Sequence, residues 1–358
     1  MKSILFLPGD GIGPEVLAQA SRVLDVLRTN HGLEVATRTD YLGGAALDRY
    51  GVPLAEETLH KARESSLVIM GAVGGPKWKV AYELRPEQGL LNLRKGLGLY
   101  ANLRPALCFP ALADASSLKR EYVEDLDMLI VRELIGGVYF GQPRGIESLP
   151  DGQRRGLNTQ SYTTHEIVRV ARVAFKLARE RNNRVCSVEK SNVMESGLLW
   201  REEVTALHAS EYEDVELHHM YADNCAMQLI KNPKQFDVIV TDNLFGDILS
   251  DAAAMLTGSL GMLPSAALGE AGMPGLYEPI HGSAPDIAGQ GIANPCAAIL
   301  SLAMALRLQL ERADLADSVE RAVSKALADG YRTRDLAEAP NLSIVGTAAM
   351  CDAIIERL

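Results

Sequence analysis

Two aspartates one helical turn apart indicate a candidate metal site. Asp247 and Asp251 stand four residues apart in Asp247–Leu256, a segment whose apolar spacing predicts a helix, and side chains at that spacing share one helix face. Two carboxylates on one face are natural ligands for Mg²⁺ or Mn²⁺. The alternative is that both aspartates only stabilise the first turns of the helix, because the helix dipole favours acidic side chains near an N-terminus. Asp223, which opens another predicted helix, is a third candidate ligand.

Three arginines are candidates for holding carboxylates. Arg94, Arg104 and Arg132 each present a planar fork of donors, which suits a carboxylate. If the segment before Arg94 is helical, Leu90 shares its face, and Leu91 is adjacent. Three such cations beside an apolar pair would suit a dicarboxylate with an alkyl branch. The alternative is that they are surface arginines in unrelated ion pairs.

The glycine-rich segment Pro8–Glu15 follows a predicted strand and opens a predicted helix, as a dinucleotide fingerprint does. Its glycines at positions 9, 11 and 13 do not fit G-x-G-x-x-G, because position 14 is proline. We therefore interpret it as a tight strand-to-helix turn. The absence of Walker-type and G-x-S-x-G motifs disfavours ATP use and serine hydrolysis.

Short apolar, β-branched runs alternate with longer helical patterns along the chain, which predicts an α/β protein. The predicted strands are Ile4–Leu7, Glu34–Thr39, Leu67–Ala72, Met128–Arg132, Val185–Val188, Val215–Met220 and Phe236–Thr241. The predicted helices are Pro14–Arg28, His165–Arg181, Leu198–Ala209, Ala222–Ile230, Asp247–Leu256, Pro295–Leu310, Leu315–Ala328 and Thr347–Leu358. Two stretches are irregular: Met262–Gly291, whose length suggests a functional loop, and Gly136–Leu157, which could be an arm or an interface loop.

Composition narrows the class of protein. A chain of 358 residues favours two domains. The net charge of −10 and the lack of a dense Lys/Arg run argue against nucleic-acid binding. No stretch approaches the ~20 apolar residues of a membrane span. Five cysteines without a C-x-x-C pair are typical of reduced thiols, so we expect a cytoplasmic protein.

The motifs taken together resemble the isocitrate/isopropylmalate dehydrogenase family. The resembling segments are Pro8–Val16, Leu90–Pro105, Val131–Gly141, Asn243–Gly261 and Glu278–Pro295. They follow in the family's order over nearly the whole chain. The resemblance implies a two-domain α/β fold with a large mixed sheet flanked by helices, which is not a Rossmann fold.

The resemblance also implies how the domains divide. Residues 1–100 plus 253–358 would form a discontinuous cofactor-binding domain. Residues 101–252 would form a central domain with the dimer interface, the metal ligands and the acid/base residues. The protein would be a homodimer with shared active sites.

Site roles follow from the same resemblance. Leu90, Leu91 and, from the partner subunit, Val193 would contact the alkyl group of the substrate. The substrate carboxylates would be held by Arg94, Arg104 and Arg132, and the acid/base pair would be Tyr139 and Lys190. The metal ligands would be Asp223, Asp247 and Asp251, with Asp223 also touching the substrate. Lys190 and Asp223 would come from the second subunit.

A later segment resembles the family's cofactor loop. Its candidate cofactor-binding residues are His281, Gly282, Ser283, Ala284, Asp286, Ile287 and Asn294. Backbone amides near Gly282 would approach the phosphates. Asp286 would accept hydrogen bonds from the adenosine ribose and repel a 2′-phosphate, which favours NAD over NADP.

The implied activity is NAD-dependent oxidative decarboxylation of 3-isopropylmalate to 4-methyl-2-oxopentanoate and CO₂, a step of leucine biosynthesis that requires Mg²⁺ or Mn²⁺. Alternatives are a related dehydrogenase acting on homoisocitrate, isocitrate, tartrate or malate, and a non-catalytic regulatory subunit. One departure from many relatives is Lys79-Val80, where an acidic residue is usual. It affects the local loop and not the residues assigned to chemistry.

Overall fold

The protein divides into two compact units in the computed structural model, which describes residues 1–336 and 343–358. Unit 1 comprises Met1–Leu99, Leu107–Asp125 and Ala254–Leu358, and unit 2 comprises Tyr100–Ala106 and Leu126–Ala253. Residues 107–125, which the predicted central domain includes, lie in unit 1 of the structure. The cofactor and interface roles of the two domains stay predictions.

Unit 1 contains a mixed sheet. Its strands are β1 (Lys2–Gly9), β2 (Val35–Thr39), β3 (Leu67–Ala72), β11 (Pro264–Leu268) and β12 (Gly275–Pro279), with a small pair β13 (Tyr331–Arg332) and β14 (Ser343–Ile344). The order is β2-β1-β3-β12-β11. All neighbours are parallel except β11 and β12. This order, with its antiparallel strand, differs from the Rossmann order.

Unit 1 also contains helices, several of which contact the strands of this sheet. They are α1 (Gly13–Asn30), α2 (Gly44–Tyr50), α3 (Glu56–Glu64), α4 (Pro86–Gly96), α5 (Arg120–Val123), α10 (Cys296–Leu308), α11 (Ala313–Ala328) and α12 (Thr347–Ile355), with short 3-10 turns η1 (Tyr82–Leu84), η2 (Pro110–Ala115), η5 (Met255–Thr257), η6 (Leu260–Met262) and η7 (Arg334–Leu336). Helix α10 packs against β11, β12, α1 and α11. Its small, apolar side chains are buried almost all round, as expected of a helix enclosed by neighbours.

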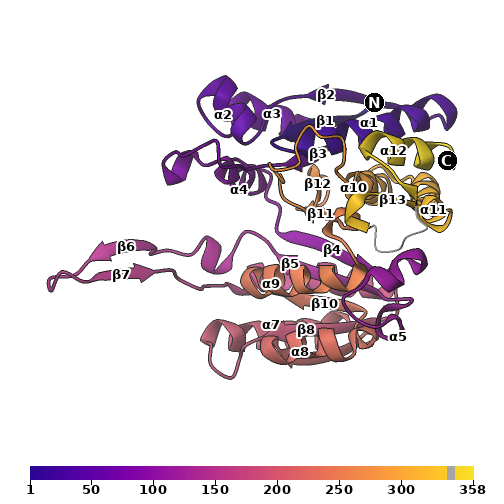
Figure 1. Ribbon diagram of the computed structural model, residues 1–358. Coiled ribbons are helices and arrows are strands. Elements are labelled where there is room, and N and C mark those ends of the chain that lie inside the picture. Colours follow the sequence, from indigo (N-terminus) through magenta and orange to yellow (C-terminus); the bar gives the residue numbers. More distant parts are fainter. Residues whose placement is uncertain (337–342) are drawn as a thin grey trace. The chain divides into compact units, whose positions relative to one another are not determined.

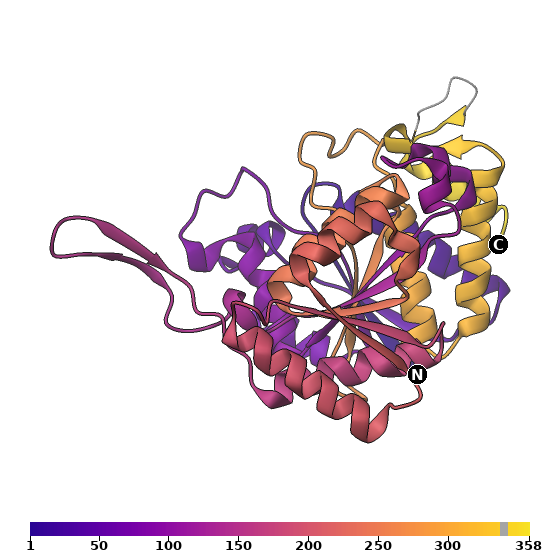
Figure 2. The same ribbon diagram turned by 90° about the horizontal axis from the view of Figure 1, so that it is seen from below.

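Unit 2 is built on strands in the order β4-β5-β10-β8-β9. They are β4 (Ala101–Leu107), β5 (Asp127–Glu133), β8 (Arg184–Glu189), β9 (Glu216–Tyr221) and β10 (Val238–Thr241), with a separate hairpin of β6 (Gly145–Ser148) and β7 (Arg154–Leu157). The helices are α6 (Thr164–Arg179), α7 (Glu195–Glu211), α8 (Ala222–Lys231) and α9 (Asn243–Ala254), with 3-10 turns η3 (Gly137–Tyr139) and η4 (Pro233–Gln235). The β6–β7 hairpin extends away from the rest of unit 2 as an arm (Figures 1 and 2).

Local sequence explains why these helices form where they do. In α6, Thr163 and Glu166 make a reciprocal capping box, and the buried side chains recur every three to four residues from Ile167 to Ala178. Helix α1 begins with Pro14 in its first turn, where proline is tolerated. No helix in residues 1–336 and 343–358 is long and apolar enough to cross a bilayer.

The predicted α/β fold, with mixed β-structure flanked by helices, is confirmed. Most predicted elements are present with boundaries shifted by a few residues. The stretch predicted to be irregular at 262–291 contains β11 and β12, and the stretch at 136–157 contains the hairpin arm. All five cysteines are free and buried.

Candidate active site

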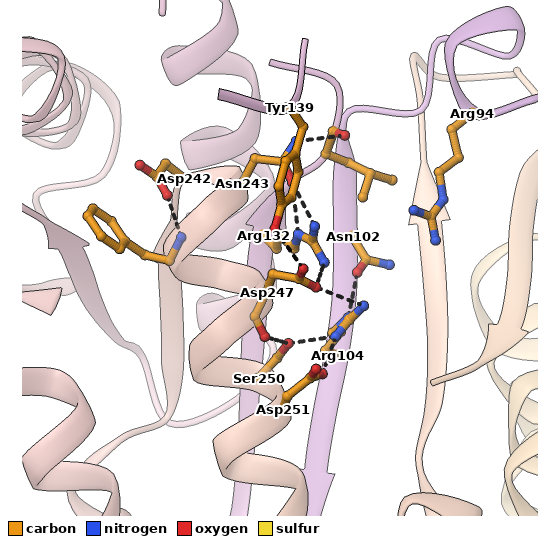
Figure 3. A network of polar contacts seen from close by, with 12 residues as sticks. Arg94, Asn102, Arg104, Arg132, Tyr139, Asp242, Asn243, Asp247, Ser250 and Asp251 are labelled. Carbon is orange, nitrogen blue, oxygen red and sulfur yellow. Dashed lines mark hydrogen bonds and ion pairs between the residues drawn. The ribbon is translucent and has the colours of Figure 1, made fainter. Parts of the chain in front are cut away.

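Four predicted site residues meet inside unit 2. Arg104 lies on β4, Arg132 lies on β5, and Asp247 and Asp251 lie on α9 (Figure 3). Arg104 Nη1 donates to Asp251 Oδ1 at 2.9 Å, and its Nη2 lies 3.7 Å from Asp247 Oδ1. Arg132 Nη1 donates to the same oxygen of Asp247. The two aspartates therefore share one helix face, directed at the two guanidinium groups.

Burial differs between the acids and the bases of this cluster. The Arg104 and Arg132 side chains are only 11% and 5% exposed, whereas those of Asp247 and Asp251 are 35% and 62% exposed. Arg104 is further fixed by Asn102 Oδ1, which accepts from its Nε at 2.8 Å. The two carboxylates are therefore open to a cation from solvent, whereas the two guanidinium groups are largely covered and paired with them.

Tyr139 joins the cluster from η3. Its hydroxyl donates to Asp247 Oδ2 at 2.9 Å, and the Arg132 guanidinium lies 5.8 Å from the ring centroid. Burial, together with the hydrogen bond to Asp247 and its charge, raises the pKa of Tyr139. The phenol therefore stays protonated at neutral pH and can act as a proton donor.

Lys190 and Asp223 form a second group in unit 2. Lys190, directly after β8, donates from Nζ to Asp223 Oδ1 at 2.7 Å, and this hydrogen bond lowers the pKa of Asp223. Asp223 opens α8, as predicted. Among the described residues of one chain, no three His, Cys, Asp or Glu side chains are arranged to hold a metal. One chain thus does not bring Asp223 together with Asp247 and Asp251.

Unit 2 also exposes large apolar side chains close in sequence to these residues. Val193 is 71% exposed, and Met227, Ile230 and Ile248 are each about 60% exposed. Exposed apolar side chains of this size, when they cluster, are typical of a protein–protein interface.

In unit 1, Arg94 lies on α4, which confirms the helix suspected there. Leu90 and Leu91 are half-buried on the same helix. Arg94 Nη2 donates to Glu278 Oε1 at 2.5 Å, and both side chains are largely buried. Glu278 lies on β12, within the resembling segment, but the motifs had not assigned it a role.

The predicted cofactor loop follows β12. His281 Nδ1 lies 2.9 Å from the Gly282 carbonyl oxygen, and its buried Nε2 has no hydrogen-bond partner among the described residues. Burial lowers the pKa of His281, so its imidazole is neutral. A side chain at Gly282 would meet nothing described within 4 Å, whereas Ala284 has a left-handed φ of 37°. Among the described residues, the loop therefore has free space at the Gly282 Cβ position and a buried imidazole nitrogen without a hydrogen-bond partner.

The remaining predicted loop residues differ in burial and in their hydrogen bonds. Ser283 is buried, Ile287 is half-buried, and Asp286 is exposed with its carbonyl oxygen accepting from Gln290. Asn294 is buried; its Nδ2 donates to Asp335 Oδ2 at 3.0 Å, and its Oδ1 accepts from the backbone at the start of α10. Asp335 was missed, because it lies outside the resembling segments.

The glycine turn at the start of the chain supports this loop. Ile12 N donates to the Ser283 carbonyl oxygen at 2.8 Å, and a Cβ at Gly11 would lie 1.9 Å from that oxygen. Gly9 and Gly11 both have positive φ. The interpretation of this segment as a tight turn is confirmed, and its close packing explains the glycines.

A family model described as isocitrate/isopropylmalate dehydrogenase matches residues 3–354. The chain is 64% identical over 351 residues to the 3-isopropylmalate dehydrogenase of Caulobacter vibrioides, covering 98% of this chain and 99% of that protein. It is 60% identical over 362 residues to the 3-isopropylmalate dehydrogenase of Pelagibacter ubique, covering 100% and 98%.

Solved structures show the same fold. The crystal structure of isocitrate dehydrogenase from Methylococcus capsulatus has a TM-score of 0.86 at 36% identity, covering 100% of this chain and 99% of that chain. A beta-decarboxylating dehydrogenase from Thermococcus kodakarensis has a TM-score of 0.80 at 33% identity, covering 100% and 96%.

The chain therefore belongs to the isocitrate/isopropylmalate dehydrogenase family. It is an oxidoreductase of the decarboxylating dehydrogenase type, which confirms the resemblance found in its motifs and leaves the non-catalytic alternative without support.

Proposed function

We propose that this enzyme catalyses the NAD-dependent oxidative decarboxylation of 3-isopropylmalate to 4-methyl-2-oxopentanoate and CO₂, in leucine biosynthesis. The proposal rests mainly on helix α4, which carries the apolar pair Leu90 and Leu91 together with the largely buried cation Arg94. The names of the relatives that are 60–64% identical agree with it. Isocitrate would need polar partners for an additional carboxylate where these leucines stand, and a site without such partners binds a polar group poorly.

In this reaction the arginines would bind the substrate, and the acid/base residues would transfer protons. Arg94, Arg104 and Arg132 would bind the two carboxylates, since buried guanidinium groups bind carboxylates with charge-assisted hydrogen bonds. Lys190 would accept the proton of the C2 hydroxyl as hydride leaves C2. Tyr139, kept protonated by its raised pKa, would protonate the product carbon after loss of CO₂.

The donor chemistry around α9 fits a hard divalent cation. Asp247 and Asp251 offer partly exposed carboxylate oxygens one helical turn apart, which Mg²⁺ and Mn²⁺ prefer as ligands. Asp223 of the partner subunit would supply the third carboxylate. When bound, the cation polarises the oxygen on C2 of the substrate and stabilises negative charge there.

The loop after β12 fits a dinucleotide. The unused, buried Nε2 of His281 and the open space at Gly282 would accommodate a ribose and the phosphates, and Asp286 would accept from the ribose hydroxyls. When bound, NAD supplies the acceptor for the hydride.

A homodimer would complete each site. The exposed side chains of Val193, Met227, Ile230 and Ile248 would be buried between two copies of unit 2. This contact would bring Lys190 and Asp223 of the partner subunit to the cluster on α9. The five reduced thiols agree with a cytoplasmic location.

The purified enzyme should reduce NAD with 3-isopropylmalate only in the presence of Mg²⁺ or Mn²⁺. The measurement is NADH absorbance, with and without a chelator, followed by restoration with excess Mn²⁺. Homoisocitrate, isocitrate, tartrate and malate serve as competing substrates. A higher kcat/KM with any of these, or full activity in chelator, would contradict the proposal.

Asp286→Ala should weaken NAD binding by roughly 10–100-fold and improve use of NADP relative to NAD. The reason is that hydrogen bonds to a charged group contribute about 1.5–3 kcal/mol, and the lost charge no longer repels a 2′-phosphate. Titration of each dinucleotide by fluorescence measures both effects. Glu270→Ala, which removes another exposed acid of unit 1, is the control. Unchanged NAD affinity in Asp286→Ala would place the ribose elsewhere.

A further inference from the structure

Asn243, the first residue of α9, is fully buried beside Arg132. Its Oδ1 accepts two hydrogen bonds from the Arg132 guanidinium, from Nε at 3.0 Å and from Nη2 at 2.8 Å. Its Nδ2 donates to the carbonyl oxygens of Leu134 and Gly136, both at 3.0 Å. Both donors and both acceptor positions of the carboxamide are therefore used.

Only one orientation of this carboxamide is compatible with its surroundings. The guanidinium of Arg132 can only donate, and the two carbonyl oxygens can only accept. A flipped Asn243 side chain would leave both sets of groups unpaired in a buried position, which is costly. The backbone N–H of Asn243 also donates to the Tyr162 hydroxyl at 3.0 Å, and that hydroxyl donates to the buried Glu133. Asn243 is thus held rigidly.

Two paths lead from Asn243 to Tyr139. Along the first, Nε and Nη2 of Arg132 donate to Asn243, which leaves Nη1 directed at Asp247 (Figure 3). Asp247 in turn accepts a hydrogen bond from the Tyr139 hydroxyl. Along the second, Asn243 holds the carbonyl of Gly136, which directly precedes η3, the turn that carries Tyr139. A single side chain therefore fixes both a guanidinium and a phenol.

We propose that Asn243 is a positioning residue that sets the Arg132 guanidinium and the Tyr139 hydroxyl at a fixed spacing. This inference rests on the proposed function, in which Arg132 binds a substrate carboxylate and Tyr139 delivers a proton. With the hydrogen bonds of Asn243 intact, a substrate held by Arg132 presents its reacting carbon to Tyr139 without movement of either side chain. A misplacement of about 1 Å can lower a rate roughly 100-fold.

Two variants test the acceptor oxygen and the donor nitrogen of the Asn243 carboxamide separately. Asn243→Leu removes the acceptor for Arg132 and the donors to both carbonyls, so kcat should fall about 100-fold and KM should rise about tenfold. Asn243→Asp keeps an acceptor for Arg132 but loses the donors. Its kcat should fall as far, while its KM should rise less than in Asn243→Leu. Gln160→Met is the matched control, because it removes a 2.8 Å hydrogen bond to Asp242 just before α9 without touching Arg132 or residues 134–136.

A second measurement does not depend on activity. Nitrogen-15 NMR follows exchange of the Arg132 Nε–H, assigned by its loss in Arg132→Lys. Exchange should be slow in the unaltered protein and in Asn243→Asp, and fast in Asn243→Leu. Fast exchange in the unaltered protein would overturn the inference even if neither Asn243 variant folds.

The kinetic outcomes also decide the question. A kcat within threefold of the unaltered enzyme in Asn243→Asp, or an equal loss in Gln160→Met, would overturn the inference. If the unaltered enzyme does not oxidise 3-isopropylmalate, the proposed function fails, and the NMR experiment still decides whether Asn243 holds Arg132.

Discussion

Lys190→Met should lower kcat about 10²–10⁴-fold, the usual contribution of a general acid–base group, while NAD binding stays nearly unchanged. Methionine keeps an unbranched side chain of similar length but cannot accept and return the proton of the substrate hydroxyl. The lost hydrogen bond to Asp223, at 2.7 Å, involves an aspartate whose side chain is 65% exposed, so water can replace the lysine and the fold should be retained.

Steady-state kinetics and NAD titration measure the two effects separately. Lys2→Met is the control, because Lys2 Nζ also makes one hydrogen bond, to the Gln309 carbonyl at 2.8 Å, but lies on β1 of unit 1. It should behave like the unaltered enzyme. Near-normal turnover in Lys190→Met would remove Lys190 from the proposed chemistry.

Asp247→Asn should raise the Mn²⁺ concentration for half-maximal activity about 100-fold and lower kcat at saturating Mn²⁺. Asp247 is the most connected acid of the site: it accepts from both Arg132 and Tyr139, and it would also bind the cation. Asparagine retains one oxygen but loses the negative charge, and its NH₂ group must face one of these two donors. The substitution therefore weakens metal binding and disturbs Tyr139 together.

Activity as a function of Mn²⁺ and direct Mn²⁺ binding by electron paramagnetic resonance measure this prediction. Asp352→Asn is a suitable control, because Asp352 also accepts from an arginine, Arg22 Nη2 at 2.5 Å, but is exposed on α12. A Mn²⁺ requirement in Asp247→Asn equal to that of the control would exclude Asp247 as a ligand.

The fold was predictable wherever apolar residues follow a regular period. Strand β3 is a continuous buried run, and α6 has a capping box before an apolar stripe, so both are recognisable from sequence. Strands β11 and β12 were missed, because each is five residues long and bounded by proline or glycine. Their place in the sheet depends on tertiary pairing: β12 pairs with β3, which is distant in sequence, and β11 pairs with β12.

The site was predictable only in part for a similar reason. The spacing of Asp247 and Asp251 predicts a shared helix face, and the structure has it. Nothing in local spacing shows that Arg104 and Arg132 lie on β4 and β5 facing the same helix, because that proximity arises from tertiary packing. The sequence does not single out Asn243, because a neutral side chain suggests neither metal binding nor ion pairing. Its positioning role is indicated only by its five hydrogen bonds in the structure.

The insertion of β12 next to β3 has a consequence for synthesis on the ribosome. Strand β3 ends at residue 72, and its parallel partner is completed only at residue 279, roughly 200 residues later. At typical elongation rates of 5–20 residues per second, one edge of this apolar strand stays unpaired for about 10–40 s until β12 has been synthesised. Unpaired apolar edges invite wrong pairing. We therefore expect the free edge of β3 in the nascent chain to need protection from wrong pairing until β12 has been synthesised.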